Sequence, residues 1–171
     1  APAISRRSLG DHAFRETHGL DCAYMGGSMA NGIASVDMVI ALGRAGMLGA
    51  FGAGGMPPHR IRSAIAEIKR ALPSGPYAFN LIHSPSEPAL EQRAVDLYLD
   101  HEIRTVEASA YLTLTPHVVR YRVAGLETDP HGRIRIRNRV IAKLSRREVA
   151  AKFMAPAPPR MLAALVDQGL V

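Results

Sequence analysis

The chain reads Met47-Leu48-Gly49-Ala50-Phe51-Gly52-Ala53-Gly54-Gly55, and this stretch together with the next 17 residues decides the fold class. The apolar run at 47–51 is typical of a buried strand, and glycines end it. Pro57 and Pro58 then open a predicted helix, since proline at the first helical position forfeits no hydrogen bond. The apolar face of that helix consists of Ile61, Ile65, Ile68 and Leu72, at i, i+4, i+7 and i+11. A strand, a tight turn and an amphipathic helix make one β/α unit.

This unit recurs five times along the chain. The predicted strands are Cys22 to Met25, Met47 to Phe51, Tyr77 to Ile82, Thr105 to Ala110 and Val140 to Leu144. Start signals for helices follow them: Ser35 and Ser86 as N-caps, proline at the first helical position in Thr115-Pro116, and a capping box from Ser145 to Glu148. Strands that alternate with helices predict a parallel sheet, either a small doubly wound domain or a piece of an eight-unit barrel. The abrupt carboxyl end favours the piece.

The ends of the chain differ from this repeating part, 21–154. Residues 1–20 are polar and are interpreted as an approach segment. Residues 155–159 form a Pro-rich, stiff linker, and a short helix is expected at Met161 to Val166. Within the repeats, Arg133 to Arg137 alternates basic and apolar residues behind a turn, which predicts a hairpin with one basic face. The helix that Ser86 would cap is expected to turn four side chains inward, namely Leu90, Ala94, Leu97 and Tyr98.

Composition restricts the function. With 171 residues and 47% hydrophobic residues, the chain can bury a domain-sized core. Its net charge of +6 favours acidic partners, but the absence of Trp and of any nucleic-acid-binding pattern argues against nucleic acid. The single Cys22 and the lack of paired Cys/His spacing predict no disulfide and no metal site, which fits the cytoplasm. No apolar run approaches the roughly 20 residues needed to span a bilayer.

The carboxyl ends of parallel strands open on one face, so five segments are expected to line one mouth. They are Gly26-Gly27-Ser28-Met29, Gly52-Ala53-Gly54-Gly55, Asn80-Leu81-Ile82-His83, Glu107-Ala108-Ser109 and Lys143-Leu144-Ser145. Main chain without side chains can approach a flat ring or a phosphate closely, and glycine also permits tight turns. Two glycine clusters at equivalent turns favour a ligand. A dinucleotide-binding fingerprint is disfavoured, because Pro57 stands where its third glycine belongs.

The polar residues of the mouth leave alternatives open. The Asn80 amide can both donate to and accept from a heterocycle edge, or it can cap the next turn. His83 is either a proton donor or an ordinary loop residue. Glu107 and Lys143 are charges at the ends of apolar strands, where they either pair with one another across the barrel or take part in catalysis. Cys22 and the methionines 25, 29, 38 and 47 are interpreted as packing residues.

The motifs of the mouth resemble the PfaD family, the enoyl reductases of polyunsaturated fatty acid synthases and trans-acyltransferase polyketide synthases. The resemblance is carried by 24–35, 46–55, 77–85, 105–110 and 140–143, and it runs from about Gly10 to the end. Wider relatives are nitronate monooxygenases and bacterial enoyl reductases, all FMN-binding TIM barrels. The resemblance therefore implies an α/β fold, a partial TIM (β/α)8 barrel of about five units, with 155–171 as the start of a helical insertion.

The resemblance also assigns candidate residues. It places Gly26, Gly27, Ser28, Met29, Gly54, Gly55, Asn80, Glu107, Ser109 and Lys143 at the flavin or the adjoining substrate pocket. Lys143 and His83 are the candidate catalytic residues. Family members continue with the helical insertion, a Gly-Gly-His segment and strands that hold the FMN phosphate, none of which occurs in this sequence. We therefore expect the amino-terminal part of a larger polypeptide that binds flavin poorly when isolated, with the catalytic proton donor elsewhere.

The expected activity is FMN-dependent reduction of the α,β double bond of enoyl thioesters carried by an acyl carrier protein, with NADPH or NADH as reductant. Expected partners are the carrier protein, other synthase subunits and, as one assembly, a second copy in a homodimer. Two alternatives remain open. One is a nitronate monooxygenase that uses the same cofactor against oxygen, and the other is a non-catalytic docking or scaffold subunit of a synthase.

Overall fold

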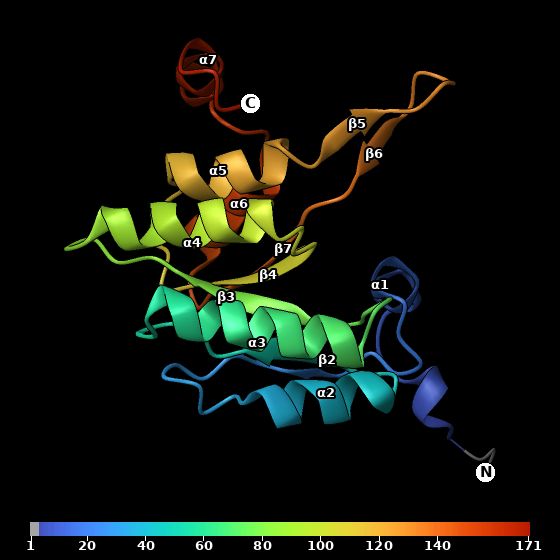
Figure 1. Ribbon diagram of the computed structural model, residues 1–171. Coiled ribbons are helices and arrows are strands. Elements are labelled where there is room, and N and C mark those ends of the chain that lie inside the picture. Colours follow the sequence, from blue (N-terminus) through green and yellow to red (C-terminus); the bar gives the residue numbers. More distant parts are fainter. Residues whose placement is uncertain (1–3) are drawn as a thin grey trace. The chain divides into compact units, whose positions relative to one another are not determined.

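A computed structural model describes residues 4–171, so the first three residues of the predicted approach segment lie outside it. Five parallel strands in the order β1-β2-β3-β4-β7 are each followed by a helix, which confirms the predicted α/β partial barrel (Figure 1). Residues 4–80 and 81–171 form two compact units, whose boundary falls inside β3 (Ala78–Ile82). Each unit is described separately.

The first unit carries the first two β/α repeats. Its elements are η1 (Arg6–Ser8), α1 (His12–His18), β1 (Met25–Gly26), α2 (Val36–Arg44), β2 (Leu48–Phe51) and α3 (Pro58–Ala71), followed by the start of β3. Parallel pairing aligns Gly26 with Gly49 and Phe51 with Phe79. The apolar face of α3 is buried as predicted, at Ile61, Ile65, Ile68 and Leu72.

The approach segment contains a helix that the sequence pattern did not predict. Helix α1 begins where the Asp11 carboxylate accepts from the backbone N–H of Ala13. It ends at Gly19, which adopts the left-handed conformation with φ 66°. The following loop is tied back, because the Asp21 and Cys22 amides both donate to the Gly46 carbonyl. Cys22 is therefore a half-buried loop residue and does not belong to the core or to β1.

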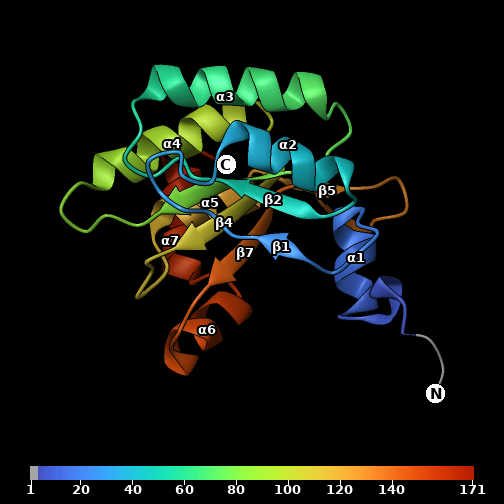
Figure 2. The ribbon, with the colours of Figure 1, turned by 90° about the horizontal axis from the view of Figure 1, so that it is seen from below.

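The second unit holds the remaining repeats and a hairpin. Its elements are α4 (Pro88–Asp100), β4 (Thr105–Ser109), α5 (Pro116–Val123), β5 (Leu126–Thr128), β6 (Ile134–Ile136), β7 (Arg139–Lys143), α6 (Arg147–Met154) and α7 (Pro159–Asp167). Strands β4 and β7 run parallel, with Thr105 beside Arg139 and Ser109 beside Lys143 (Figure 2).

One of the three predicted helix caps is confirmed, and Thr115, at the predicted helix start, is a cap as well. Ser35 accepts from the Met38 amide at 3.2 Å, and Thr115 accepts from the Val118 amide at 3.2 Å. The prediction for Ser86 is wrong, because α4 begins at Pro88 and its N-cap is Glu87. Ser145 is also not a cap, since Arg146 takes that position.

The shifted start of α4 changes which side chains face the core. A proline at the first helical position requires an extended residue before it, so the helix cannot include Glu87. Leu90, expected to point inward, is 41% exposed, whereas Glu91 is 1% exposed. Val95 and Tyr98 continue the buried face at i+4 and i+7. A carboxyl group is thus built into the apolar face of α4.

The hairpin of β5 and β6 is antiparallel and exposed, as the alternation predicted. Leu126, Ile134 and Ile136 lie on one face and are 40–70% exposed. Two arginines are paired, Arg137 with Glu127 at 2.9 Å and Arg133 with Asp129 at 3.5 Å.

The core of the second unit contains three buried tyrosines. Tyr98 and Tyr121 are fully buried and Tyr111 is 3% exposed. The Tyr121 hydroxyl donates to the Ile103 carbonyl at 2.7 Å. Burial raises the pKa of all three phenols above their ordinary value. Within residues 4–171, the longest apolar helices fall short of what a membrane span requires.

Candidate functional site

The two glycine-rich turns of the first unit lie side by side. The Asn31 amide donates to the Gly54 carbonyl at 2.7 Å, and the Gly32 amide donates to the Gly52 carbonyl at 2.9 Å. The Gly52 amide in turn donates to the Ala34 carbonyl at 3.0 Å. These three backbone hydrogen bonds join the loop after β1 to the loop after β2. The predicted meeting of the two glycine clusters at one rim is therefore present in this unit.

Close backbone approach explains two of these glycines. A Cβ at Gly52 would lie 1.7 Å from the Met29 carbonyl oxygen, which excludes any side chain there. A Cβ at Gly55 would lie 2.3 Å from the Asn31 Oδ1 atom, and Gly55 has φ +76°. Both residues are therefore glycines for a structural reason, the close approach of the two loops. This structural role is compatible with ligand binding, because the joined loops leave an exposed rim.

The exposed rim consists of main chain and apolar side chains. Gly27 and Gly55 are exposed, Ser28 is half-buried and Met29 is 47% exposed, so Met29 does not pack as expected. Gly26 and Gly54 lie deeper. A Cβ at Gly26 would meet the Leu42 side chain of α2 at 2.4 Å, so this glycine lets the strand approach the helix.

Asn80 belongs to the same unit and is 4% exposed. Because Phe51 pairs with Phe79, the next step of the register places Asn80 beside Gly52. The side chains of Phe51 and Phe79 pack below them, with ring centroids 5.5 Å apart. A buried amide thus stands inside β3, beside the end of β2 where the glycine loop 52–55 begins.

Four predicted residues gather at the carboxyl edge of the second unit. The His83 amide donates to the Ser109 carbonyl at 3.0 Å, and Ser109 pairs with Lys143 in the sheet. The Lys143 Nζ atom lies 2.5 Å from Glu107 Oε1. The predicted ion pair is present, but its partners lie on neighbouring strands instead of across a barrel. Glu107 is almost fully buried and Lys143 is half exposed.

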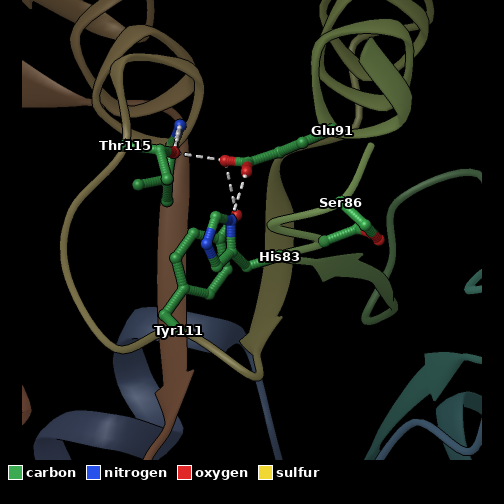
Figure 3. A network of polar contacts seen from close by, with 7 residues as sticks. His83, Ser86, Glu91, Tyr111 and Thr115 are labelled. Atoms are coloured by element: carbon green, nitrogen blue, oxygen red, sulfur yellow. Dashed lines mark hydrogen bonds and ion pairs between the residues drawn. The ribbon is translucent and has the colours of Figure 1, made fainter. Parts of the chain in front are cut away.

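His83 is part of a buried polar network that the sequence pattern did not predict (Figure 3). Its Nδ1 atom lies 3.0 Å from Glu91 Oε2. The other carboxylate oxygen, Oε1, accepts from the Tyr111 hydroxyl at 2.8 Å and from Thr115 Oγ1. The His83 ring stacks on Tyr111, with centroids 5.2 Å apart and an interplanar angle of 24°. Phe153 of α6 packs edge-on against Tyr111 at 5.6 Å.

The charges and the hydrogen-bond roles of the residues in this network agree with one another. Burial, and then the charge of Glu91, raises the pKa of Tyr111, so its hydroxyl keeps its proton and donates. Thr115 Oγ1 accepts from the Val118 amide, which leaves its proton for Glu91. A carboxyl group that meets two hydroxyl donors is well satisfied as a carboxylate, which only accepts, and the Nδ1–H tautomer of His83 then donates to Oε2. The network therefore presents a fixed negative charge to His83 Nδ1.

A sequence signal for Glu91 exists. Glu91, Val95 and Tyr98 follow one another at i, i+4 and i+7, which places a charge in an apolar stripe. Such a position requires buried donors, and the hydroxyl groups of Tyr111 and Thr115 supply them. Within residues 4–171, no group of three or more His, Cys, Asp or Glu residues is arranged to hold a metal ion.

The sequence of this chain is similar to those of several biosynthetic proteins. The chain is 53% identical over 161 residues to one of the polyunsaturated fatty acid synthase subunits of Thraustochytrium sp., a match that covers 94% of the chain and 11% of that protein. It is 41% identical to the polyketide biosynthesis protein PksE of Bacillus subtilis, over 98% of the chain and 22% of that protein. No family model matches the chain.

A solved structure has the same fold. The enoyl reductase domain of MlnA, from the macrolactin biosynthesis cluster of Bacillus amyloliquefaciens, superposes with a TM-score of 0.92 at 40% identity. The match covers 96% of this chain and 38% of that one. The chain therefore spans well under half the length of these relatives. These similarities confirm the resemblance that the motifs indicated.

Proposed function

We propose that this chain, which shares its sequence and fold with PfaD-like enoyl reductases, is part of a flavin-dependent enoyl reductase of a polyketide or polyunsaturated fatty acid synthase. The observation that carries the proposal is the pair of joined glycine loops beside Asn80. They form a rim of open main chain at the carboxyl ends of parallel strands, where ligands of β/α folds bind.

The residues of this rim fit an FMN ring. Gly27 and Gly55 offer exposed main chain, Met29 offers an apolar surface, and Gly54 with Asn80 lies behind them. We assign Gly26, Gly27, Ser28, Met29, Gly54, Gly55 and Asn80 to holding it. Glu107, Ser109 and Lys143 are assigned to the flavin or the adjoining substrate pocket. When bound, FMN supplies a hydride equivalent taken from NADPH or NADH.

Within this proposal, the protein binds the acyl thioester, excludes water and stabilises charge on the thioester carbonyl. The half-exposed Lys143 ammonium at the end of β7 suits such an oxygen, because its partner Glu107 is buried behind it. The substrate arrives on an acyl carrier protein. The exposed hairpin, 126–137, carries three arginines against two acidic residues, so it offers an acidic carrier a weakly positive surface.

The proposal is tested on the longest natural polypeptide that contains this sequence. Purified protein is expected to carry flavin, whose absorbance bleaches with NADPH under nitrogen and returns when a crotonyl thioester is added. Return of the absorbance must be accompanied by butyryl thioester.

Other outcomes favour the alternatives. Oxidation of alkyl nitronates without nicotinamide, with no response to the crotonyl thioester, would indicate a nitronate monooxygenase. Colourless protein that takes up no added FMN would indicate a docking or scaffold subunit and would overturn the proposal.

A further inference from the structure

His83 is held in one orientation by contacts on three sides. Glu91 engages its Nδ1 atom at 3.0 Å, Tyr111 covers one ring face, and its own amide is fixed to Ser109. Its side chain is 17% exposed, so part of the ring reaches the surface. Among residues 4–171, the hydrogen bond and ion pair of the His83 ring both go through Nδ1, and none is formed by the other ring nitrogen, Nε2. The network thus fixes one nitrogen and leaves the second available.

His83 lies at the carboxyl edge of the strands of the second unit. It follows β3 directly, and its hydrogen bond to Ser109 places it at the carboxyl edge of β4. Ser109 in turn pairs with Lys143 at the end of β7. His83, Ser109 and Lys143 therefore follow one another along the edge where substrates of β/α folds bind.

We propose that His83 is a catalytic residue whose Nε2 contacts the enoyl thioester and donates the proton that the α carbon receives, and that Glu91 is its positioning residue. This inference rests on the proposed function, and it replaces the expectation from the family resemblance that the proton donor lies elsewhere. An ionised Glu91 holds the proton of Nδ1–H, and it balances the charge of the ring when Nε2 is also protonated. Tyr111 and Thr115 fix Glu91 by donating to its other oxygen.

The proton step conserves atoms and electrons. Reduction of the double bond adds a hydride at the β carbon, from the nicotinamide and flavin cofactors, and leaves an electron pair shared between the α carbon and the carbonyl oxygen. The Nε2–H bond of the doubly protonated ring breaks and a C–H bond forms at the α carbon. The N–H electron pair stays on Nε2, His83 becomes neutral, and a proton from water restores it.

Substitution of Glu91 by Gln makes a specific prediction about tautomers. Tyr111 and Thr115 both donate to Oε1, so the Gln oxygen is retained there and its NH2 group faces Nδ1. Nδ1 must then accept, which holds the His83 ring neutral with its only proton on Nε2. Proton donation is weakened although the packing volume is unchanged.

The kinetic test separates the two half-reactions of the longest natural polypeptide. His83→Gln is expected to leave bleaching of the flavin by NADPH unchanged and to slow its reoxidation by crotonyl-pantetheine about 100-fold or more, the usual contribution of a general acid. Glu91→Gln is expected to slow the same step at least about 10-fold. Ser86→Ala is the local control, because its hydroxyl contacts Ser84 and not Glu91. His12→Gln controls for loss of an exposed His–Glu pair.

A second readout needs neither turnover nor a substituted protein. Diethyl pyrocarbonate modifies accessible histidine nitrogens, and peptide mass spectrometry reports each site. Butyryl-pantetheine, which cannot be reduced, is expected to slow modification of His83 in the wild-type protein by at least about fivefold, an estimate from site occupancy at saturating ligand. Modification of His12 serves as the internal reference.

The outcomes are distinguishable. Wild-type flavin that is not reoxidised by the thioester overturns the proposed function and this inference with it. If wild-type flavin is reoxidised and His83→Gln reacts at the same rate, only the inference fails. Equal modification of His83 with and without butyryl-pantetheine also overturns it, since the ring would then not touch the substrate.

Discussion

Replacing Gly52 by alanine should separate the two glycine loops. The added Cβ would lie 1.7 Å from the Met29 carbonyl oxygen, so that carbonyl must retreat by more than about 1 Å to reach ordinary contact. Neither atom is at the end of a flexible side chain. Three backbone hydrogen bonds depend on this contact, namely Ala34 to Met29 at 3.2 Å, Gly32 to Gly52 at 2.9 Å and Gly52 to Ala34 at 3.0 Å.

The expected cost derives from these bonds. At about 1 kcal/mol for each hydrogen bond, Gly52→Ala should lower the free energy of unfolding by about 3 kcal/mol. That is a large part of the roughly 5 to 15 kcal/mol typical of a domain. With a denaturant slope of about 2 kcal/mol per molar urea, the unfolding midpoint should fall by about 1.5 M. Amide hydrogen exchange at Gly32 and Gly52 should accelerate by about 100-fold, the rate equivalent of the same free energy.

A matched variant separates the steric clash from a general effect of alanine. Gly19 lies in the same unit, has φ +66° and has no heavy atom within 4 Å of an added Cβ. Gly19→Ala should therefore cost only the strain of the left-handed conformation, about 1 to 2 kcal/mol, and leave exchange at Gly32 unchanged. The explanation of the rim is refuted if Gly52→Ala costs no more than Gly19→Ala, or if the amides of Gly32 and Gly52 keep their protection.

Four further substitutions test the second unit. Lys143→Met should lower the free energy of unfolding by about 1 to 2 kcal/mol, because it removes the cation beside the buried Glu107, and the half-exposed position of Lys143 limits the loss. In a double-mutant cycle with Glu107→Gln, the interaction energy between the two residues should account for at least half of this loss. Strictly additive effects of the two substitutions would argue against the pair. Thr115→Val should cost about 2 to 3 kcal/mol, because it loses both the cap of α5 and a donor to Glu91. Tyr111→Phe loses only a donor and should cost about 1 to 2 kcal/mol in urea unfolding, so the reverse order would contradict the network. Because burial raises the pKa of Tyr98, Tyr111 and Tyr121, the unfolded chain releases three protons above pH of about 10 that the folded chain keeps. The free energy of unfolding should be unaffected by these groups below pH of about 10 and then fall by up to about 4 kcal/mol per pH unit, at about 1.36 kcal/mol per proton. Tyr121→Phe should reduce that slope by about a third, whereas Tyr24→Phe at an exposed position should leave it unchanged.

Local chemistry made most of the fold predictable. The stripe of α3, the cap at Ser35 and the helix start at Pro116 depend on residues within one or two turns of each other, and all were confirmed. The predictions for Ser86 and Ser145 were wrong by one residue, because Glu87 and Arg146 occupy the N-cap positions. For α4, the constraint that Pro88 imposes on Glu87 outweighed the preference of serine for the cap.

The candidate site was predictable only where it depends on strand ends. The order of β/α repeats brings Gly54 and Asn80 together in the first unit, and His83 and Ser109 together in the second, without knowledge of any side-chain contact. The network around Glu91 joins a helix to residues 20 and 24 positions further on. Because these partners are far apart in the sequence, the only sequence signal for the network is the charge of Glu91 within the apolar stripe of α4.

The most direct measurement is the product formed by the longest natural polypeptide from crotonyl thioester and NADPH under anaerobic conditions. Butyryl thioester formed in proportion to the flavin cycles completed is the predicted result. Bound flavin that NADPH bleaches, and that no enoyl thioester restores, would contradict the assignment of this chain to enoyl reduction.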